Sequence, residues 1–261
     1  MRIVRFTPGP DAGLGLDPLF GVLEDDGVIS IISGDPIYSG IQKTAATIEL
    51  NKVRLLAPII PRSKVVCVGK NYADHAAEMG GVVPEEPIIF LKPNTSVIGP
   101  NDTIVWPEMS ERVDHEAELA IVIGRICKDV PKERVNDVIF GYTIANDVTA
   151  RDLQKKDGQW TRAKGFDTFC PIGPWIDTDF VPGTQKITAT IAGEVKQSAQ
   201  ISDMIFDVPT IINFVSRVMT LLPGDIILTG TPAGIGPMVA GEKATMAIEG
   251  LGELTNKLSA R

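Results

Sequence analysis

Three acidic residues in the stretch 113–154 have a spacing that suits chemistry. Glu116 and Glu118 stand at the head of an apolar run. If that run is a strand, its side-chain period of two puts both glutamates on one face. A second apolar run, 140–145, is followed closely by Asp147, so a third carboxylate could meet the first two. The same alternation also fits the solvent face of an edge strand, and the pattern alone favours neither interpretation.

Converging carboxylates repel one another, and burying an unpaired charge is costly. Such a cluster therefore needs a proton or a cation. A ligand set made only of oxygen atoms favours hard divalent ions, which are Mg²⁺, Mn²⁺ or Ca²⁺, and disfavours zinc.

The residues after Asp147 switch to a helical pattern. Thr149, with an acidic residue three positions later, predicts a capped helix over 149–156. At helical spacing Arg151 and Gln154 share the side of Asp147, which would bring a cation and a donor beside the metal and suit an anionic substrate. The alternative is an ordinary Asp/Arg pair on a solvated helix.

Four ordered segments resemble the fumarylacetoacetate hydrolase family: HEAELAIVIG, GYTIANDVTARDLQ, WTRAKGFDTFCPIGPW and PGDIILTGTPAGIGP. The resemblance spans roughly residues 61–258, so it covers most of the chain. It implies that Glu116, Glu118 and Asp147 are the family's ligands for a divalent ion, normally Mg²⁺ or Mn²⁺.

The segment NYADHAAE places His75 and Glu78 three residues apart, which makes them neighbours if 73–79 is helical. A carboxylate that fixes the imidazole tautomer makes a usable general base, although such a pair on a surface helix is more often only a weak ion pair. The family resemblance implies a catalytic His/Glu pair on a mobile lid, with the segment 80–87 as its flexible connection.

Two lysines and a threonine gain a role only through the resemblance. A lysine such as Lys92, at the end of an apolar strand, usually reaches solvent, and Lys164 in a polar loop over 159–167 would usually be surface. In the family the corresponding lysines face the active site, so Lys92 becomes a substrate contact and Lys164 a catalytic residue. Thr231, in a glycine-rich loop, becomes a contact for a substrate carboxylate. His115 would point away from Glu116 and serve a supporting role.

Composition limits the classes of function. The formal net charge is −8, the isoelectric point is near 4.9, and no block of Lys or Arg occurs, so nucleic-acid and anionic-membrane binding are disfavoured. Three cysteines without a C-x-x-C pair fit a reduced, cytoplasmic protein. The chain also lacks an apolar run long enough to span a bilayer.

The predicted fold is α+β and dominated by strands. Short strands at 3–6, 19–23 and 28–32 indicate a small N-terminal β unit over 1–61, followed by a catalytic domain over 62–261. The β-roll arrangement of that domain, and a homodimer, are implied by the resemblance alone.

The resemblance predicts a metal-dependent enzyme that acts on a small 2-oxo or 1,3-dicarbonyl acid. The metal would chelate the substrate and stabilise an enolate. The branch that fits best contains 2-hydroxyhepta-2,4-diene-1,7-dioate isomerases and acylpyruvate hydrolases, enzymes of aromatic catabolism. Decarboxylation of oxaloacetate is the alternative reaction. A non-catalytic metal-binding protein on the same scaffold is a further alternative, but it would be expected to lose one of the site residues, and none is lost.

Overall fold

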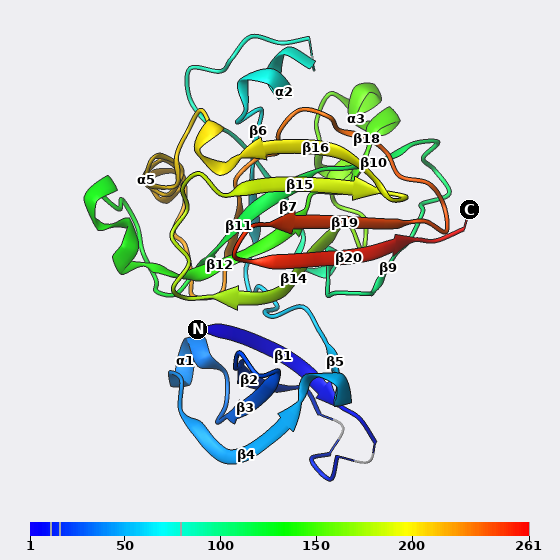
Figure 1. Ribbon diagram of the computed structural model, residues 1–261. Coiled ribbons are helices and arrows are strands. Elements are labelled where there is room, and N and C mark those ends of the chain that lie inside the picture. The colour runs from blue at the N-terminus through cyan, green and yellow to red at the C-terminus, as the bar shows by residue number, and fades with distance from the viewer. Residues whose placement is uncertain (11, 16, 79, 261) are drawn as a thin grey trace.

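The computed structural model describes residues 1–10, 12–15, 17–78 and 80–260. Figure 1 shows a small N-terminal group of strands beneath a larger body. The N-terminal elements are β1 (Arg2–Pro8), β2 (Leu19–Leu23), β3 (Val28–Ile32), α1 (Pro36–Ser39), β4 (Lys43–Glu49), η1 (Leu50–Lys52) and β5 (Val53–Leu55). The three strands predicted here are present, and Gly27 turns between β2 and β3 with a φ of 81°.

The larger body begins with β6 (Val65–Gly69), so the predicted division at residue 61 falls between β5 and β6. Its remaining helices are α2 (Ala73–Glu78), η2 (Asn94–Ser96), η3 (Lys132–Asp137), α3 (Arg151–Asp157), α4 (Thr161–Lys164), η4 (Ile201–Asp203) and α5 (Val208–Val218). Its remaining strands are β7 (Ile88–Lys92), β8 (Val97–Ile98), β9 (Thr103–Ile104), β10 (Val113–His115), β11 (Ala117–Ile123), β12 (Ile139–Asn146), β13 (Thr149–Ala150), β14 (Cys170–Asp177), β15 (Lys186–Ile191), β16 (Glu194–Gln200), β17 (Ile226–Leu228), β18 (Gly236–Pro237), β19 (Lys243–Ile248) and β20 (Gly252–Leu258).

One long sheet runs through both parts of the chain. Its strand order is β4-β3-β2-β1-β14-β12-β11-β17-β6-β7, with β5 beside β1 and β8 beside β14. The N-terminal strands join the body where Arg2 pairs with Asp177 and Ile3 with Ile176. A second sheet, β16-β15-β19-β20-β9, and a small one, β13-β10-β18, complete the strands of the described residues. The strand-dominated α+β prediction is confirmed.

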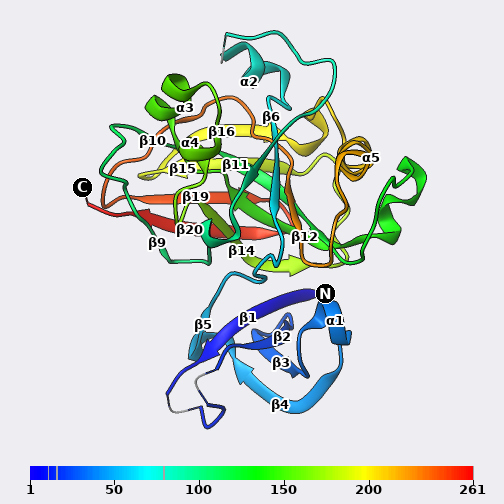
Figure 2. The ribbon, with the colours of Figure 1, turned by 180° about the vertical axis from the view of Figure 1, so that it is seen from behind.

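The central strand β11 separates two apolar cores. Leu119 and Ile121 pack into the core shared with the second sheet, and Ala120 and Val122 into the core on the other face. In the sheet, β11 lies between β12 and β17, and both of its faces are covered. The exposed edge-strand interpretation of Glu116 and Glu118 is therefore wrong. Figure 2, the view from behind, shows α2 at the end of the molecule opposite to the N-terminal strands.

Two local predictions around the site need correction, although the helix predicted over 149–156 is itself present as α3. The helix predicted from residue 149 begins at Arg151, because Thr149 belongs to β13. Asp152 does not close a capping box, since its carboxylate accepts hydrogen bonds from Ser110 Oγ (2.7 Å) and Glu111 N (3.0 Å). The predicted loop over 159–167 contains the short helix α4. The helix predicted over 73–79 is present as α2 to Glu78, and Met79 lies outside the described residues.

Candidate active site and metal centre

The three predicted metal ligands come together at the end of the β11–β12 pair. Glu118 lies opposite Ala145 in the antiparallel register, so the end of β12 runs back alongside Glu116. The Asp147 amide donates to the Glu116 carbonyl at 2.9 Å. One carboxylate oxygen from each of Glu116, Glu118 and Asp147 lies within 4.8 Å of the others, and all three side chains are buried. The donor set therefore fits a hard divalent ion.

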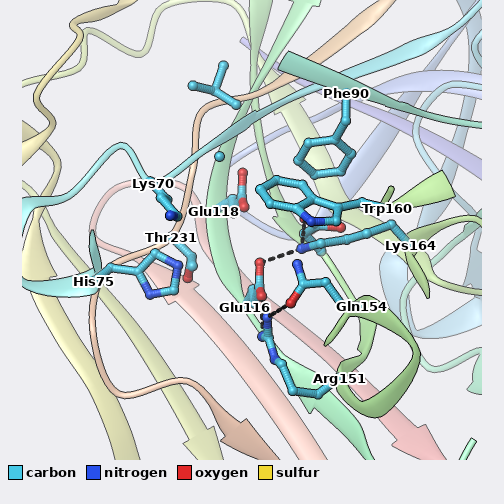
Figure 3. A pocket seen from close by; sticks show the side chains of 13 residues that line it. Lys70, His75, Phe90, Glu116, Glu118, Arg151, Gln154, Trp160, Lys164 and Thr231 are labelled. Atoms are coloured by element: carbon cyan, nitrogen blue, oxygen red, sulfur yellow. Dashed lines mark hydrogen bonds and ion pairs between the residues drawn. The ribbon is translucent and has the colours of Figure 1, made fainter. Parts of the chain in front are cut away.

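Two buried lysines pair with this cluster. Lys164 Nζ lies 2.8 Å from Glu116 Oε2 and 2.5 Å from Asp147 Oδ2 (Figure 3). Lys92 Nζ lies 2.5 Å from Asp147 Oδ1 and 3.2 Å from the Val148 carbonyl. Lys164 and Asp147 line the pocket. Among the described residues that line it, Lys92 does not occur, so Lys92 meets Asp147 from outside the pocket. Lys92 therefore contacts a predicted metal ligand and does not line the pocket where a substrate anion was predicted to bind.

Arg151 at the start of α3 links the cluster to a fourth buried carboxylate. Its Nε donates to Asp114 Oδ2 at 2.9 Å, one amino group donates to Gln154 Oε1 at 2.5 Å, and the other donates to Glu116 Oε1. Arg112 holds the same Asp114 from the solvent side, through Nε at 2.7 Å. Arg151 thus holds the Glu116 carboxylate as well as lining the pocket, and sequence reasoning missed Asp114.

The pKa values of the two glutamates move in opposite directions. Burial alone would raise the pKa of Glu116, but the charges of Lys164 and Arg151 outweigh burial and lower it. Burial raises the pKa of Glu118 well above its usual value, and the nearby charges of Asp147 and Glu116 raise it further. Of these two glutamates, Glu118 is thus the one that more needs a proton or a cation.

Helix α2 brings the predicted histidine to the same pocket. His75 is only 5% exposed, and its Nδ1 lies 3.3 Å from Glu78 Oε2. Figure 3 shows the imidazole facing the cluster from the opposite side of the pocket, beside Thr231. The Gly234 amide donates to both Glu78 carboxylate oxygens at 3.2 Å, which ties α2 to the glycine-rich loop.

The glycine-rich loop also contacts the acidic cluster. Gly230 N donates to Glu118 Oε2 at 2.6 Å. The φ of Gly230 is 96°, which favours glycine, and a Cβ at this position would lie 2.7 Å from Asn71 Cβ. Two amides of this loop thus bind the protein's own carboxylates. The hydroxyl of Thr231 lies beside them and accepts from Gln197 Nε2 at 2.8 Å. His115 Nδ1 lies 3.2 Å from Gln197 Oε1, so Gln197 links His115 to Thr231 in the pocket.

Sequence reasoning gave no role to several residues that line the pocket, among them Lys70, Phe90 and Trp160. Phe90 and Trp160 form an edge-to-face pair with centroids 5.3 Å apart, which gives the pocket an apolar wall. Lys70 follows a buried strand and a glycine. The position of Lys92 at the end of a strand made it a candidate in the sequence, and the similar position of Lys70 could have pointed to the pocket in the same way.

Comparison with known proteins agrees with this geometry. Residues 64–259 match the family model described as fumarylacetoacetate (FAA) hydrolase C-terminal, and residues 1–58 match the one described as Rv2993c-like, N-terminal. The chain belongs to the fumarylacetoacetate hydrolase family, and the family resemblance of its motifs is confirmed.

Three relatives show the range of the family. The structure of 5-carboxymethyl-2-hydroxymuconate delta-isomerase from Mycobacterium smegmatis has a TM-score of 0.91 at 48% identity, with 100% of both chains covered. The mitochondrial oxaloacetate tautomerase FAHD1 of Arabidopsis thaliana is 47% identical over 198 residues, which are 74% of this chain and 89% of the relative. Fumarylpyruvate hydrolase from Pseudomonas aeruginosa, solved with Mn²⁺ and pyruvate, has a TM-score of 0.73 at 33% identity and covers 80% of this chain and 92% of its own.

These relatives are an isomerase, a tautomerase and a hydrolase, and the family is one of enzymes. The buried acidic cluster could hold a divalent ion, and one relative was solved with Mn²⁺. Among the described residues no helix is both long and apolar enough to cross a bilayer.

Proposed function

We propose that this protein is a divalent-metal-dependent enzyme that transfers a proton on a small 2-oxo dicarboxylic acid, as an isomerase or tautomerase. One observation carries the proposal: a paired, buried histidine faces a cluster of three carboxylates across a single pocket. A base and an ion site on opposite sides of one substrate suit proton transfer next to a carbonyl, because the base removes the proton and the ion stabilises the enolate. The names of the isomerase and tautomerase relatives support this reaction type.

Glu116, Glu118 and Asp147 would hold Mg²⁺ or Mn²⁺, with Ca²⁺ as a further candidate because the ligands are all oxygen atoms. When bound there, the ion supplies Lewis-acid stabilisation of negative charge on the substrate's 2-oxo and carboxylate oxygens. Lys164 pairs with two of the three ligands, so its ammonium adds positive charge at the same place.

His75 is the proposed base. Its Nδ1 faces Glu78, so the carboxylate fixes the tautomer in which Nε2 is free to accept a proton. In the proposed reaction Nε2 takes a proton from the carbon next to the 2-oxo group and returns it to another atom of the resulting enolate. Glu78 stabilises the imidazolium between the two steps.

Three polar side chains would orient the substrate. The Gln154 carbonyl oxygen accepts from Arg151, so its amide NH₂ is left to donate into the pocket. The Thr231 hydroxyl accepts from Gln197, so its own hydrogen is free for a substrate oxygen. Arg151 would contribute charge to the same anion while it holds Glu116.

Hydrolysis of an acylpyruvate is the second candidate, because a relative solved with Mn²⁺ and pyruvate is a fumarylpyruvate hydrolase. In that reaction the same His75 would activate a water molecule instead of moving a substrate proton. Oxaloacetate decarboxylation remains the alternative reaction, and a homodimeric state, a cytoplasmic location and a role in aromatic catabolism remain predictions.

The test is an assay of purified protein with oxaloacetate, 5-carboxymethyl-2-hydroxymuconate and acetylpyruvate, with Mg²⁺, Mn²⁺ or chelator. Each reaction has its own signal. Tautomerisation is followed by enol–keto conversion, isomerisation by diene absorbance, hydrolysis by released acid, and decarboxylation by released CO₂. Mn²⁺ binding is measured separately by electron paramagnetic resonance. Full proton-transfer activity in chelated, metal-free protein would refute metal dependence. Mn²⁺ binding without turnover of any substrate would favour the non-catalytic alternative.

A further inference from the structure

We infer that Lys70 binds the second carboxylate of the substrate and makes the protein selective for 2-oxo dicarboxylic acids over monocarboxylic ones. This inference rests on the proposed function and adds the group that sets its substrate class. It starts from the basic residues that line the pocket, which are Lys70, Arg151 and Lys164, with His75 beside them.

Lys70 differs from the other basic side chains in its partners. Lys164 pairs with Glu116 and Asp147, and Arg151 pairs with Asp114 and Glu116. Lys70, in contrast, makes no ion pair with any residue that the structure describes. A substrate anion that used the paired cations would compete with buried carboxylates, whereas an anion at Lys70 meets a charge that is still available.

The backbone holds Lys70 in an uncommon conformation. The φ of Lys70 is 56°, which lies in the left-handed region that residues other than glycine seldom adopt. Asn71 anchors the next position, since its side chain accepts from Phe206 N at 2.7 Å and donates to the Thr229 carbonyl at 2.7 Å. Residues kept in such conformations by their surroundings concentrate at functional sites.

The end of helix α2 leaves room for the ammonium group. Gly80, at a φ of 68°, donates to the Ala77 carbonyl at 2.9 Å, and Gly81 donates to the Ala76 carbonyl at 3.0 Å, which is a Schellman turn. A Cβ at Gly81 would lie 2.7 Å from Lys70 Nζ. The glycine therefore makes space for the lysine head group beside the pocket.

The position of Lys70 suits the far end of a substrate. Figure 3 shows Lys70 beside His75 and Thr231, and Gln154 and Lys164 on the other side of the acidic cluster. If a 2-oxo acid places its 2-oxo and carboxylate oxygens toward the acidic cluster, the rest of its carbon chain extends toward the other walls of the pocket. A second carboxylate there needs a cation, because an unpaired buried charge is costly. A lysine, with its flexible stem, can meet that carboxylate in chains of different length.

The experiment uses two ligands that differ only in this group: oxaloacetate, and 2-oxobutanoate, in which a methyl group replaces the second carboxylate. Hydrogen–deuterium exchange at C3 is followed for both with Mn²⁺-loaded protein, and their binding is measured by calorimetry. Lys70→Met should lower kcat/KM for oxaloacetate about 10- to 100-fold, mainly through KM, as expected for the loss of one charged contact. Exchange and binding of 2-oxobutanoate should change less than about twofold.

Three further variants separate charge from structure. Lys70→Arg should keep most of the selectivity because it keeps the charge. Gly81→Ala should raise KM for oxaloacetate by displacing the ammonium, since its Cβ meets Lys70 Nζ and its own φ is not positive. Lys155→Met, on the exposed side of α3, is the matched control. It should change neither the exchange nor the binding of either ligand.

Each outcome decides the inference. If Lys70→Met weakens both ligands equally, or the wild type binds both ligands equally well, the inference is refuted and the proposed proton transfer stands. If the wild type exchanges neither ligand, the proposed function is refuted. The calorimetric comparison then still decides whether Lys70 distinguishes two carboxylates from one.

Discussion

The two sides of the pocket are built differently. On one side, which we call the strand side, Glu116, Glu118 and Asp147 come from a central strand pair and share hydrogen bonds with Lys92, Lys164, Arg151 and Gly230. On the other, the helix side, Lys70, His75 and Glu78 come from one short segment after β6. That segment is tied to the rest of the site mainly through Asn71 and through Gly234.

The difference separates two tasks. Sheet pairing and a dense ion-pair network fix the carboxylate oxygens of the acidic cluster, and the proposed ion site needs such a fixed geometry. The helix side carries the proposed base and the proposed selectivity on a segment with fewer contacts, and such segments are the ones that move in many enzymes. Changes on the strand side should therefore damage ion binding and folding together, and changes on the helix side should damage catalysis alone.

The largest expected effect is that of Asp147→Ala. It should abolish Mn²⁺ binding and activity together, and it should lower the free energy of unfolding by about 3–5 kcal/mol because Lys92 and Lys164 lose their partner in the interior. Electron paramagnetic resonance and urea unfolding measure the two effects. Asp167→Ala, an exposed aspartate nearby, is the control. Normal Mn²⁺ binding by Asp147→Ala would remove this residue from the ion site.

On the helix side, His75→Ala and Glu78→Ala should each lower kcat by about 10²- to 10⁴-fold, which is the usual contribution of a general base. The double variant should be little worse than either, because the two side chains act as one unit. Mn²⁺ affinity should stay within about twofold of the wild type. Asp74→Ala on the same helix is the control. Losses that multiply in the double variant would show that the two residues do not work as a pair.

Arg151→Ala tests the boundary between the two sides. Because Arg151 donates to Glu116, its removal should weaken Mn²⁺ binding by about 10- to 100-fold, as for other groups that orient metal ligands. It should also raise KM. Arg112→Ala, which loses only the outer contact to Asp114, should have a smaller effect. Unchanged Mn²⁺ affinity in Arg151→Ala would assign this arginine to the substrate alone.

The smallest expected effect concerns the backbone of the helix side. Lys70→Gly should raise the free energy of unfolding by up to about 1 kcal/mol, because glycine adopts a positive φ without the strain that a side chain adds. It should also lose selectivity for the dicarboxylate. Lys257→Gly, in the interior of β20, should destabilise instead, by about 0.5–1 kcal/mol. A loss of stability in Lys70→Gly, measured by urea unfolding, would show that the lysine side chain itself supports the fold.

Much of the strand side follows from the sequence. The alternation around Glu118 is a local property of one strand, and the strand that ends before Asp147 carries its own apolar pattern, so both carboxylates could be singled out as candidates without the fold. The pattern alone did not distinguish an ion site from the solvent face of a strand, and the ligand role came from the family resemblance. The partners of these carboxylates were harder to predict. Asp114 is buried through contacts with two arginines, and nothing in its local pattern distinguishes it from a surface aspartate.

Short elements and backbone contacts account for the remaining errors. Helix α4 has four residues, too few to show a helical period, so the segment read as a loop. Thr149 and Asp152 have the spacing of a capping box, but the Thr149 hydroxyl donates to the Asp147 carbonyl and to Glu116, and the Asp152 carboxylate accepts from Ser110. The amides of the glycine-rich loop bind Glu78 and Glu118, and only the folded chain shows which acceptor each amide meets.

On the strand side, with Lys70 and the His75–Glu78 pair of the helix side left out, the ionic groups cancel one another. Counted with every group ionised, four carboxylates meet four basic side chains: Asp114, Glu116, Glu118 and Asp147 against Lys92, Arg112, Arg151 and Lys164. A bound divalent ion adds two positive charges to this set, and a doubly charged anion would offset them. Ion and anion should therefore bind cooperatively, and each must raise the affinity of the other by the same factor. The fraction of the protein that carries its ion would then rise and fall with the concentration of substrate.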